Sequence, residues 1–553
     1  MIKANRKTGG QILVNSLSVQ GVRRLFCVAG ESYLPVLDAL LEHEEIEAIT
    51  CRHESCAGFM GEAYGKLTGK PGIVFVTRGP GACNASIAVH TARQDSTPMI
   101  LFMGQVRRAE KGREAFQEID VEKVFGSLAK WAAEIEDPKD IPACIERAFK
   151  EALSGRPGPV VLGLPEDMLS EEAEAAPPAS VSGEMPEMSP SDFDKIQGLL
   201  AGAERPLAIV GGTGWSDRAC RRFERFAKEN KLPVATSFRR QDLFDHRHDC
   251  YIGELGTSPN PRLVQRVKDA DVLLAAGARL SEIMTQGYTL FGEPPYPVQK
   301  LIHIYPGEEE LGKVYTPALA VLSGMESFCG GLEQLKLKAG DGKWSDWCEQ
   351  ARRDYLEWTH IDTKEQGDWH GADMTAIFAQ LRDILPSDSI VTTDAGNFSG
   401  WAQRYLRYGH PNRLLAPTSG AMGYAVPSAI SASLECPDRL VLGLCGDGGF
   451  MMSANDIATA IHHKAKPIIM VCNNGMYGTI RMHQERHYPG RVSATDLTNP
   501  DFVAYAKSFG AFSVRVEKAG DFEKAWNAAL SSERAAIIEI RMDPRQMTTN
   551  AKP

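Results

Sequence analysis

The stretch that decides the fold runs from LVLGLCGDGGF at residues 440–450 to VCNNGMYG at residues 471–478. Its apolar runs predict two buried strands, and the segment between them has room for one helix, which Ser453 is placed to cap. A crossover of this kind returns the chain to the same edge of a parallel sheet. We therefore expect Asp447 and Asn474 to lie side by side at the carboxyl ends of adjacent strands.

These two side chains predict a site for a metal ion and phosphate. Hard oxygen donors together with a backbone carbonyl suit Mg²⁺, which keeps coordination positions open for diphosphate oxygens. The glycines at 446 and 448 let the backbone approach those phosphates closely. Gly-Asp-Gly taken alone is equally compatible with a plain tight turn, and its placement before Asn473-Asn474 favours the ligand site.

Outside this stretch, short apolar runs alternate with amphipathic segments through the first third of the chain. We expect helices there at 34–42, 55–68 and 82–93, and buried parallel strands at 24–29, 47–51, 72–77 and 98–103. Such alternation is typical of a doubly wound α/β domain.

The remainder repeats this organisation twice. Residues 166–191 are rich in Glu, Ala, Pro and Ser, so we expect a surface linker there. Further strands are expected at 207–210, 233–236, 272–276 and 301–304, and then, beyond a polar helical stretch at 344–358, at 390–393, 440–445 and 468–472. The sequence thus predicts three doubly wound parallel-sheet α/β domains, at 1–175, 190–340 and 360–553.

The composition of the chain limits the classes of partner that it is expected to bind. The 553 residues carry a net charge of −10 without a basic run, which argues against nucleic acid and favours a small-molecule partner. Residues 1–18 lack the apolar core of a signal peptide and no apolar stretch is long enough to span a membrane, so we expect a cytoplasmic protein. The 12 cysteines show no CxxC pair and are expected to be reduced, buried and structural.

The Gly-Asp-Gly and Asn-Asn arrangement resembles the thiamine diphosphate signature of the superfamily of acetolactate synthase, pyruvate decarboxylase and benzoylformate decarboxylase, and the likeness covers nearly the whole chain. It implies that the three domains are a pyrimidine-binding, a central and a diphosphate- and metal-binding domain. By this resemblance the metal is held by the side chains of Asp447 and Asn474 and the carbonyl of Met476. The diphosphate is lined by Gly446, Gly448, Gly449, Tyr477 and Gly478.

A second motif, RHESCAGFMGEAYGKLTGKPG at 52–72 followed by VTRGPGACN at 76–84, resembles the pyrimidine-binding domain of that superfamily. The resemblance makes Glu54 the catalytic glutamate, which shares a proton with the aminopyrimidine ring and so helps the cofactor lose its C2 proton. Pro80 and Asn84 match positions that contact the pyrimidine.

Two further segments complete the expected cofactor site. Ser419-Gly420-Ala421-Met422-Gly423 places Met422 where the family has the apolar residue that wedges beneath the cofactor, with Gly420 beside it. Asp394-Ala395-Gly396-Asn397 matches a segment in contact with the diphosphate, so Gly396 and Asn397 are candidate contacts and Asn397 a candidate donor.

The residues expected around the substrate favour the acetolactate synthases over the decarboxylases of this superfamily, but they do not decide the reaction. GQV at 104–106 and AFQE at 115–118 resemble acetolactate synthase, so Phe116 and Gln117 are candidate walls of the substrate pocket, with Ile480 limiting its space. Ser96 stands where a benzoylformate decarboxylase has its catalytic histidine, which weakens that alternative.

Other positions depart from the biosynthetic synthase. His483 replaces the tryptophan that shapes its acceptor pocket. The segments that contact flavin in that enzyme are changed, because ARLSE at 278–282 keeps one arginine, Tyr305-Pro306 replaces acidic residues, and GELG at 253–256 lacks Met-His-Gly. We therefore expect no bound FAD and no housekeeping role in branched-chain synthesis.

Glu31 leaves the reaction open, because it lies in the turn that faces the thiazolium in the family. A carboxylate there could relay a proton and favour release of an aldehyde, although a solvated or capping Glu is the alternative. We expect the substrate to be a 2-oxo acid or a related carbonyl compound, which is decarboxylated and whose product is then either ligated to a second carbonyl or protonated. A lyase or acyl transferase acting on another carbonyl substrate is a second possibility. A non-catalytic homologue that binds the cofactor is a third. The family arrangement implies a homodimer or a homotetramer.

Overall fold

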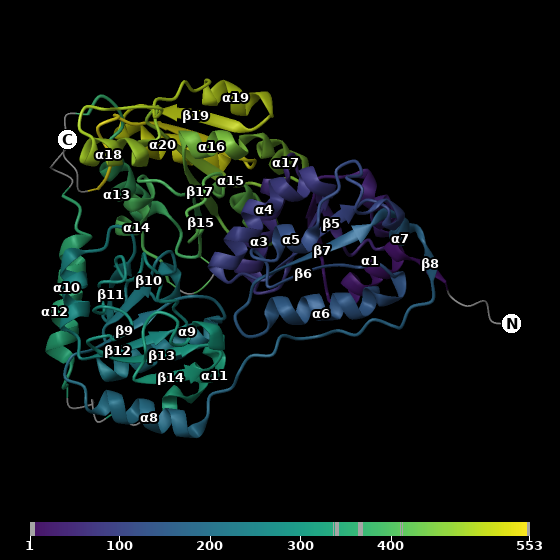
Figure 1. Ribbon diagram of the computed structural model, residues 1–553. Coiled ribbons are helices and arrows are strands. Elements are labelled where there is room, and N and C mark those ends of the chain that lie inside the picture. Colours follow the sequence, from purple (N-terminus) through teal and green to yellow (C-terminus); the bar gives the residue numbers. More distant parts are fainter. Residues whose placement is uncertain are drawn as a thin grey trace.

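The computed structural model describes residues 6–335, 337, 342–362, 369–409, 411 and 413–549. They form three six-stranded parallel sheets, one in each third of the chain, with helices on both faces (Figure 1). The predicted class, three doubly wound α/β units, is confirmed. Each predicted range contains one six-stranded sheet. Residues 1–5, 336, 338–340, 363–368, 410, 412 and 550–553 of those ranges lie outside the described residues, and the domain limits stay a prediction.

The N-terminal sheet has the strand order β3-β2-β4-β5-β7-β6. Its strands are β2 (Arg24–Cys27), β3 (Glu47–Thr50), β4 (Gly72–Thr77), β5 (Met99–Gln105), β6 (Trp131–Glu134) and β7 (Pro159–Pro165). Its helices are α1 (Gly9–Val19), α2 (Leu34–Ala39), α3 (Glu54–Thr68), α4 (Arg78–Asp95), α5 (Val121–Phe125), α6 (Ile141–Leu153) and α7 (Glu166–Ser170). The chain reverses direction across the sheet between β2 and β4, so the crevice at their carboxyl ends is the expected place for a ligand.

Two expectations for this part were wrong. The helix expected at 82–93 is α4, which begins earlier, at Arg78, because Pro80 sits in the first turn, where a helix needs no N–H partner. The expected linker at 166–191 opens with α7, whose Met168 and Leu169 are buried, and with β8 (Glu172–Ala173), which pairs antiparallel with β1 (Lys7–Thr8). Only the stretch after β8 runs along the outside, past α6 (Figure 1).

The central sheet has the order β11-β10-β9-β12-β13-β14. Its strands are β9 (Pro206–Val210), β10 (Val234–Ser237), β11 (Tyr251–Leu255), β12 (Val272–Ala276), β13 (Lys300–Tyr305) and β14 (Leu319–Leu322). The helices are α8 (Pro190–Ala201), α9 (Asp217–Asn230), α10 (Pro261–Asp269), α11 (Met325–Gly331) and α12 (Ser345–Trp358). The four predicted strands are present, and the two edge strands β11 and β14 were missed.

The C-terminal sheet has the order β16-β15-β17-β18-β20-β19. Its strands are β15 (Ile390–Thr393), β16 (Leu414–Leu415), β17 (Val441–Gly446), β18 (Ile468–Asn473), β19 (Phe512–Val516) and β20 (Ala536–Arg541). Its helices are α13 (Met374–Ile384), α14 (Ser399–Tyr405), α15 (Ala425–Glu435), α16 (Asp447–Ser453), α17 (Ile457–His462), α18 (Gly478–His487), α19 (Phe502–Ser508) and α20 (Phe522–Ser531).

The decisive stretch places its two strands as predicted, with two corrections. The crossover between them holds two short helices, α16 and α17, where one helix was expected. β17 and β18 are neighbours with Gly446 opposite Cys472, so the residues that follow each strand meet at one sheet edge. Ser453 does not cap the start of the first helix between them: α16 begins at Asp447 with Gly446 as its N-cap, and Ser453 is its last residue. The helix starts early because Gly446 adopts the extended conformation that an N-cap requires.

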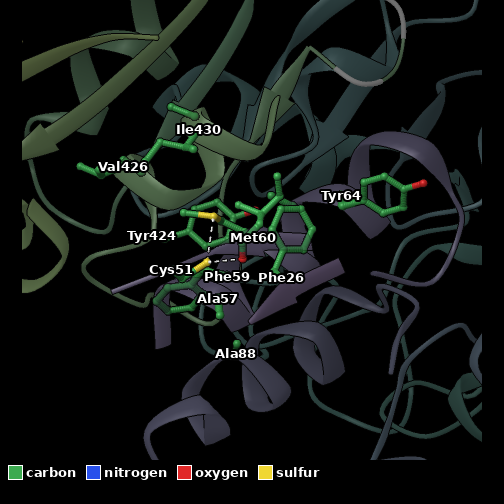
Figure 2. Packing of buried hydrophobic residues seen from close by; sticks show 14 of the residues in the cluster. Phe26, Cys51, Ala57, Phe59, Met60, Tyr64, Ala88, Tyr424, Val426 and Ile430 are labelled. Carbon is green, nitrogen blue, oxygen red and sulfur yellow. Dashed lines mark hydrogen bonds between the residues drawn. The ribbon is translucent and has the colours of Figure 1, made fainter. Parts of the chain in front are cut away.

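The N-terminal and C-terminal parts share one apolar core. Helix α3 packs on α15, and Figure 2 shows Phe59 and Met60 of α3 against Tyr424, Val426 and Ile430. The rings of Phe59 and Tyr424 meet edge to face with centroids 5.3 Å apart, a favourable arrangement for aromatic pairs. Burial on this scale holds the two parts of one chain together without help from another molecule.

The cysteines and the helices test two composition-based expectations. All 12 cysteines are free thiols and most are buried, but Cys83 is exposed on α4, so the prediction of uniform burial was wrong. Within the described residues, no helix combines the length and the apolar character needed to cross a bilayer.

Candidate active site

The first half of the site is a pocket of about 250 Å³ at the carboxyl ends of β15 and β17, where the strand order of the C-terminal sheet reverses. Ligands bind at such switch points because no helix covers the crevice between the diverging connections. Every predicted residue of the diphosphate and metal side lines it, together with Ile480: Gly396, Asn397, Gly420, Met422, Gly446, Asp447, Gly448, Gly449, Asn474, Met476, Tyr477 and Gly478.

Asp447 is buried and held from one side. Its Oδ2 accepts hydrogen bonds from the backbone N–H of Gly475 at 2.9 Å and from the side-chain amide of Asn499 at 2.6 Å. Burial raises the pKa of the Asp447 carboxyl, and these hydrogen bonds offset part of the increase. A bound cation would lower that pKa again, so proton and metal compete for this carboxylate.

The neighbouring donors fit a hard cation. The backbone N–H of Met476 donates to Asn474 Oδ1 at 3.2 Å, which orients that amide, and the N–H of Gly478 donates to the Met476 carbonyl at 2.9 Å. The described residues include no cluster of three or more His, Cys, Asp and Glu side chains able to hold a metal. A cation here would therefore be held by one carboxylate, one amide oxygen and one carbonyl, a donor set suited to Mg²⁺ with phosphate completing its coordination.

Asn499, which the sequence analysis did not single out, holds the Asp447 carboxylate in place. The amide of Asn499 donates to Asp447 and also, at 3.2 Å, to Asn473 Oδ1. Asn473 in turn donates to Glu539 Oε1 at 2.8 Å. Asn499 lies in an irregular segment 26 positions beyond Asn473, and no local pattern singles it out.

Glycine is needed at two positions of the pocket. A Cβ on Gly449 would lie 2.1 Å from Asp394 Oδ2, and one on Gly448 would lie 2.6 Å from the ring of Tyr477. Asp394 is buried and accepts hydrogen bonds from the N–H groups of Gly423 at 3.0 Å and Ala425 at 2.6 Å. Burial raises the pKa of Asp394 to about 6. The acid thus fixes the backbone next to Met422, and the two glycines allow Asp394 and Tyr477 to approach the start of α16 closely.

Asn397 is oriented as a hydrogen-bond donor. Thr479, which the sequence did not single out, donates its hydroxyl to Asn397 Oδ1 at 3.0 Å and accepts the Asn397 backbone N–H at 3.2 Å. The Asn397 amide nitrogen lies 3.6 Å from the sulfur of Met482, a weak acceptor. Because its oxygen is already engaged, Asn397 offers the pocket an N–H group.

The second half of the site lies at the carboxyl edge of the N-terminal sheet. Glu54 is the first residue of α3, and Asn84 donates to its Oε2 at 2.9 Å. Pro80 and Asn84 are exposed on the first two turns of α4. The Gln117 carbonyl accepts the N–H of Gly79 at 2.9 Å, which brings the predicted wall segment to the start of the same helix.

Two other predicted side chains of the N-terminal part, Phe116 and Glu31, differ in how they are held. Phe116 is 75% exposed. Glu31 forms an ion pair with Arg78 at 3.0 Å, and Arg78 forms a second one with Glu166 at 2.7 Å. Glu31 is therefore held by a cation at the strand switch point.

His483 faces a different space. A cleft of about 850 Å³ between the central and C-terminal sheets is lined by His483, Asn397 and Gly420 from one side and by Glu254 and Arg239 from the other. Since Asn397 and Gly420 also line the smaller pocket, the two spaces adjoin.

Within one chain, the pocket around Asp447 and the Glu54 half of the candidate site do not meet. The lining of the pocket around Asp447 comes from residues 395–547 alone, so Glu54, Glu31 and Phe116 are not among its walls. The packing of α3 on α15 turns another face of the N-terminal part towards the C-terminal part.

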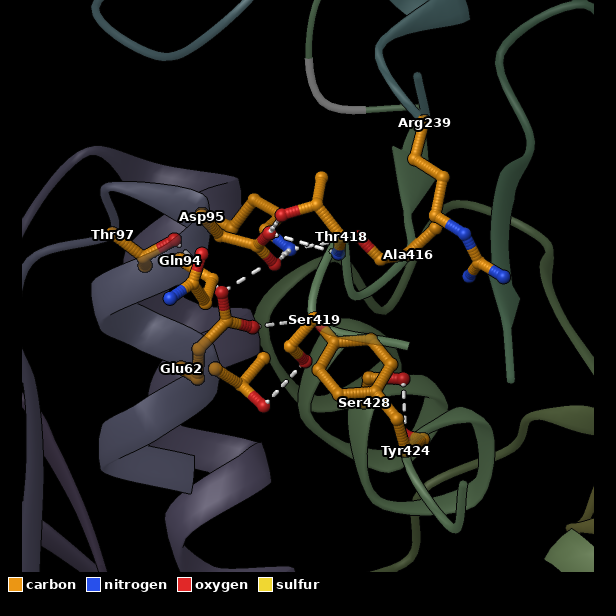
Figure 3. A network of polar contacts seen from close by, with 12 residues as sticks. Glu62, Gln94, Asp95, Thr97, Arg239, Ala416, Thr418, Ser419, Tyr424 and Ser428 are labelled. Carbon is orange, nitrogen blue, oxygen red and sulfur yellow. Dashed lines mark hydrogen bonds and ion pairs between the residues drawn. The ribbon is translucent and has the colours of Figure 1, made fainter. Parts of the chain in front are cut away.

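A buried polar network connects that internal contact to the pocket wall (Figure 3). Lys66 forms ion pairs with Glu62 at 3.1 Å and Asp95 at 2.5 Å, and donates to the carbonyl of Ala416 at 3.0 Å. Glu62 accepts from the hydroxyl of Tyr424 at 2.6 Å. Burial lowers the pKa of Lys66, but the neighbouring carboxylates more than offset this and raise it. The segment between Ala416 and Tyr424 carries Gly420 and Met422, so the N-terminal part anchors one wall of the pocket.

Comparison with known sequences identifies the class. Three family models match successive parts of the chain: the N-terminal TPP binding domain of thiamine pyrophosphate enzymes at 7–124, their central domain at 193–332 and their C-terminal TPP binding domain at 394–540. The chain belongs to the thiamine pyrophosphate enzyme family, and it is an enzyme of transferase or lyase type that depends on this cofactor, also called thiamine diphosphate.

Its relatives include several acetolactate synthases. The chain is 30% identical over 547 residues to the acetolactate synthase large subunit of Parasynechococcus marenigrum, covering 97% of this chain and 87% of the relative. It is 29% identical to the acetolactate synthase of Bacillus subtilis over 545 residues, covering 97% and 94% of the two chains. The large subunit of acetolactate synthase isozyme 2 from Escherichia coli is 29% identical over 538 residues, covering 97% and 95%.

Proposed function

We propose that the protein binds thiamine diphosphate through Mg²⁺ and decarboxylates a 2-oxo acid, then joins the product to a second carbonyl compound, as acetolactate synthases do. The observation that carries this proposal is the pocket in which Asp447, Asn474 and the Met476 carbonyl adjoin the glycine-lined wall. The similarity to acetolactate synthases supports the reaction class.

Each residue has a definite task in this proposal. The bound cofactor supplies an electron sink for the bond beside the carbonyl. Glu54 holds a proton at the pyrimidine ring, and Asn84 fixes the orientation of the Glu54 carboxylate. Met422 supports the cofactor from below, while Asn397 donates to the diphosphate. Phe116, Gln117, Ile480 and His483 would surround the substrate.

The active site would need two chains. Glu54 does not line the pocket of Asp447 in its own chain, so a partner chain would bring its Glu54, Pro80 and Asn84 over that pocket. A homodimer is the smallest assembly that meets this need, and a homotetramer would contain two such pairs. The cytoplasmic location, the lack of nucleic-acid and membrane partners and the lack of FAD are proposed on the sequence alone.

The deciding experiment is Glu54→Gln in the holoenzyme. Glutamine cannot share the proton, so we expect thiamine diphosphate to bind with unchanged affinity while C2 deuterium exchange and carbon dioxide release fall by roughly a hundredfold or more. Glu122→Gln is the matched control, because Glu122, although exposed where Glu54 is half-buried, is also an acid in the first turn of a helix, α5. Unchanged exchange in Glu54→Gln would overturn the assigned role.

A second candidate is a decarboxylase that releases an aldehyde, which the position of Glu31 favours. A panel of 2-oxo acids with and without an added aldehyde or second 2-oxo acid separates the two: acetolactate from pyruvate supports ligation, whereas aldehyde alone supports a proton relay through Glu31. In the second case Glu31→Gln should shift the product towards ligation. Carbon dioxide release from no 2-oxo acid would favour a lyase or acyl transferase, or a non-catalytic cofactor-binding protein.

A further inference from the structure

A small pocket outside the proposed active site is lined mainly by arginine. It has a volume of about 170 Å³ and lies between the central and C-terminal parts, where the loop before β11, helix α12, helix α13 and the segment after α14 meet. Its walls include His246, Tyr355, Leu356, Thr359, Tyr405 and four arginines, Arg247, Arg352, Arg382 and Arg407. No one element supplies more than one of the arginines, so tertiary structure assembles the cluster.

The arginines are incompletely neutralised. Arg247 pairs with Asp245 at 2.9 Å, and Arg382 contacts Asp383 at 3.2 Å. Within the described part of the chain, Arg352 donates to the carbonyl of Tyr251 at 2.9 Å, lies over the ring of Tyr355 at 5.0 Å and has no ion pair. Arg407 is exposed and, among the described residues, has neither a hydrogen bond nor an ion pair.

Arg352 and Arg407 also act on each other weakly. Burial lowers the pKa of Arg352 most; Tyr355, Asp249 and Tyr251 act in the opposite direction, and the positive charge of Arg407 makes the smallest contribution, lowering that pKa further. Such a concentration of positive charge is unexpected on a chain whose net charge is −10. An anion in the pocket would relieve the repulsion and take up the free N–H groups.

We propose that this arginine pocket binds a phosphate-type oxyanion, as inorganic phosphate or as the phosphate group of a small metabolite. Guanidinium groups recognise tetrahedral and planar oxyanions through paired N–H donors, and the volume suits a single phosphate group. Arg352 and Arg407 would be its main ligands, with Arg247 and Arg382 at the rim. Because the ligands come from both parts, binding would tie the central part to the C-terminal part.

This site is separate from the diphosphate pocket. The two share no lining residue, whereas the arginine pocket shares Tyr355 and Thr359 with the larger cleft that contains His483. The last turn of α12 therefore lies between the anion and that cleft. The inference does not depend on the reaction proposed above.

The test uses holoenzyme saturated with thiamine diphosphate and Mg²⁺, so that the diphosphate pocket is filled. Inorganic phosphate is titrated against chloride at matched ionic strength, and the unfolding temperature and the ³¹P line width of phosphate are followed. We expect phosphate, and not chloride, to raise the unfolding temperature saturably. Arg407→Gln should weaken the apparent affinity for phosphate by roughly tenfold or more, because a charged hydrogen-bond donor is lost.

Arg353→Gln is the matched control. Arg353 is exposed on the same helix as Arg352 and does not line the pocket, so its replacement changes the charge equally. Retained phosphate binding in Arg353→Gln and lost binding in Arg407→Gln would support the proposal. Equal phosphate effects in both variants would overturn the proposal, because they indicate a general ionic effect. A phosphate effect that disappears as the thiamine diphosphate concentration is raised further would also overturn it, because it indicates binding in the diphosphate pocket.

Discussion

Asp95, at the end of α4, accepts two hydrogen bonds from Thr418, one from its backbone N–H at 2.8 Å and one from its hydroxyl. The same carboxylate is paired with Lys66. Thr418 belongs to the segment that carries Gly420 and Met422 into the pocket around Asp447. A buried acid of the N-terminal part thus holds a wall of a pocket otherwise built by the C-terminal part of the same chain.

Asp95→Asn should therefore weaken cofactor binding more than the chemical step. The substitution removes one of the two buried carboxylates paired with Lys66 and leaves Glu62 as its partner, and losing a hydrogen bond to a charged group costs about 1.5–3 kcal/mol of stability. We expect a lower unfolding temperature and a larger Kd for thiamine diphosphate, with kcat at saturating cofactor changed less. Asp388→Asn, at an exposed acid, is the control. Normal cofactor affinity in Asp95→Asn would show that the wall does not depend on this contact.

Asp447→Asn should abolish metal-dependent cofactor binding while the fold persists. An amide can still accept the hydrogen bond from Gly475, but it brings no negative charge to a divalent cation. Calorimetric titration of thiamine diphosphate with and without Mg²⁺ measures the effect. A variant that binds the cofactor as tightly as the parent would mean that the metal site lies elsewhere.

Asn499→Ala should lower the affinity for Mg²⁺ and cofactor by roughly 10–100-fold, the usual effect of removing a group that orients a metal ligand. The amide of Asn499 bridges Asp447 and Asn473, so its loss frees the carboxylate to turn. The exposed Asn527 on α20 provides the control Asn527→Ala. If both variants bind Mg²⁺ alike, the bridge has no part in metal binding.

Gly449→Ala should damage the pocket, because its methyl group would lie 2.1 Å from Asp394 Oδ2 and force that carboxylate or the glycine backbone to move. We expect weak cofactor binding and a destabilised chain. Gly198→Ala on α8 adds the same methyl group where nothing lies within 4 Å, and it should be neutral or slightly stabilising. Unchanged cofactor affinity in Gly449→Ala would show that the wall yields at little cost.

Glu254→Gln should change how stability depends on pH. Burial raises the pKa of Glu254 from 4.5 to about 7, although the backbone N–H and the charge of Arg239 partly offset this. The folded chain therefore keeps the proton between these two values while the unfolded chain loses it, and stability falls as pH rises through this window. Glutamine removes that loss, so the variant should gain up to roughly 3 kcal/mol relative to the parent between about pH 4.5 and pH 8.

Unfolding midpoints of both chains at about pH 5.5 and about pH 8 measure this difference. Glu293→Gln, at an exposed acid of the central part, should leave the pH dependence unchanged. A constant difference between parent and Glu254→Gln at the two pH values would mean that Glu254 does not titrate in this range.

Local pattern in the sequence determined much of this protein. Apolar runs predicted the strands on which the pocket is built, and a helical crossover between β17 and β18 was enough to place Asp447 beside Asn474, although the structure divides that crossover into α16 and α17. Seven strands of the three sheets were missed: β6, β7, β11, β14, β16, β19 and β20. The edge strands β6, β14 and β19 are partly exposed and carry little apolar signal, whereas a short buried run such as β7 or β20 cannot be told from a buried helix segment by periodicity alone. Where α4 and α16 begin was also misjudged, since helix ends depend on single capping residues.

Tertiary structure alone decided what surrounds those strands. The brace of Asn499 on Asp447, the anchoring of Thr418 by Asp95 and the pairing of Glu31 with Arg78 join segments that are distant in sequence and follow no common period. The same holds for the gathering of four arginines in one pocket. Periodicity reports which face of an element is buried, whereas the partners on that face are set by how whole elements pack, so these contacts could be found only in the folded chain.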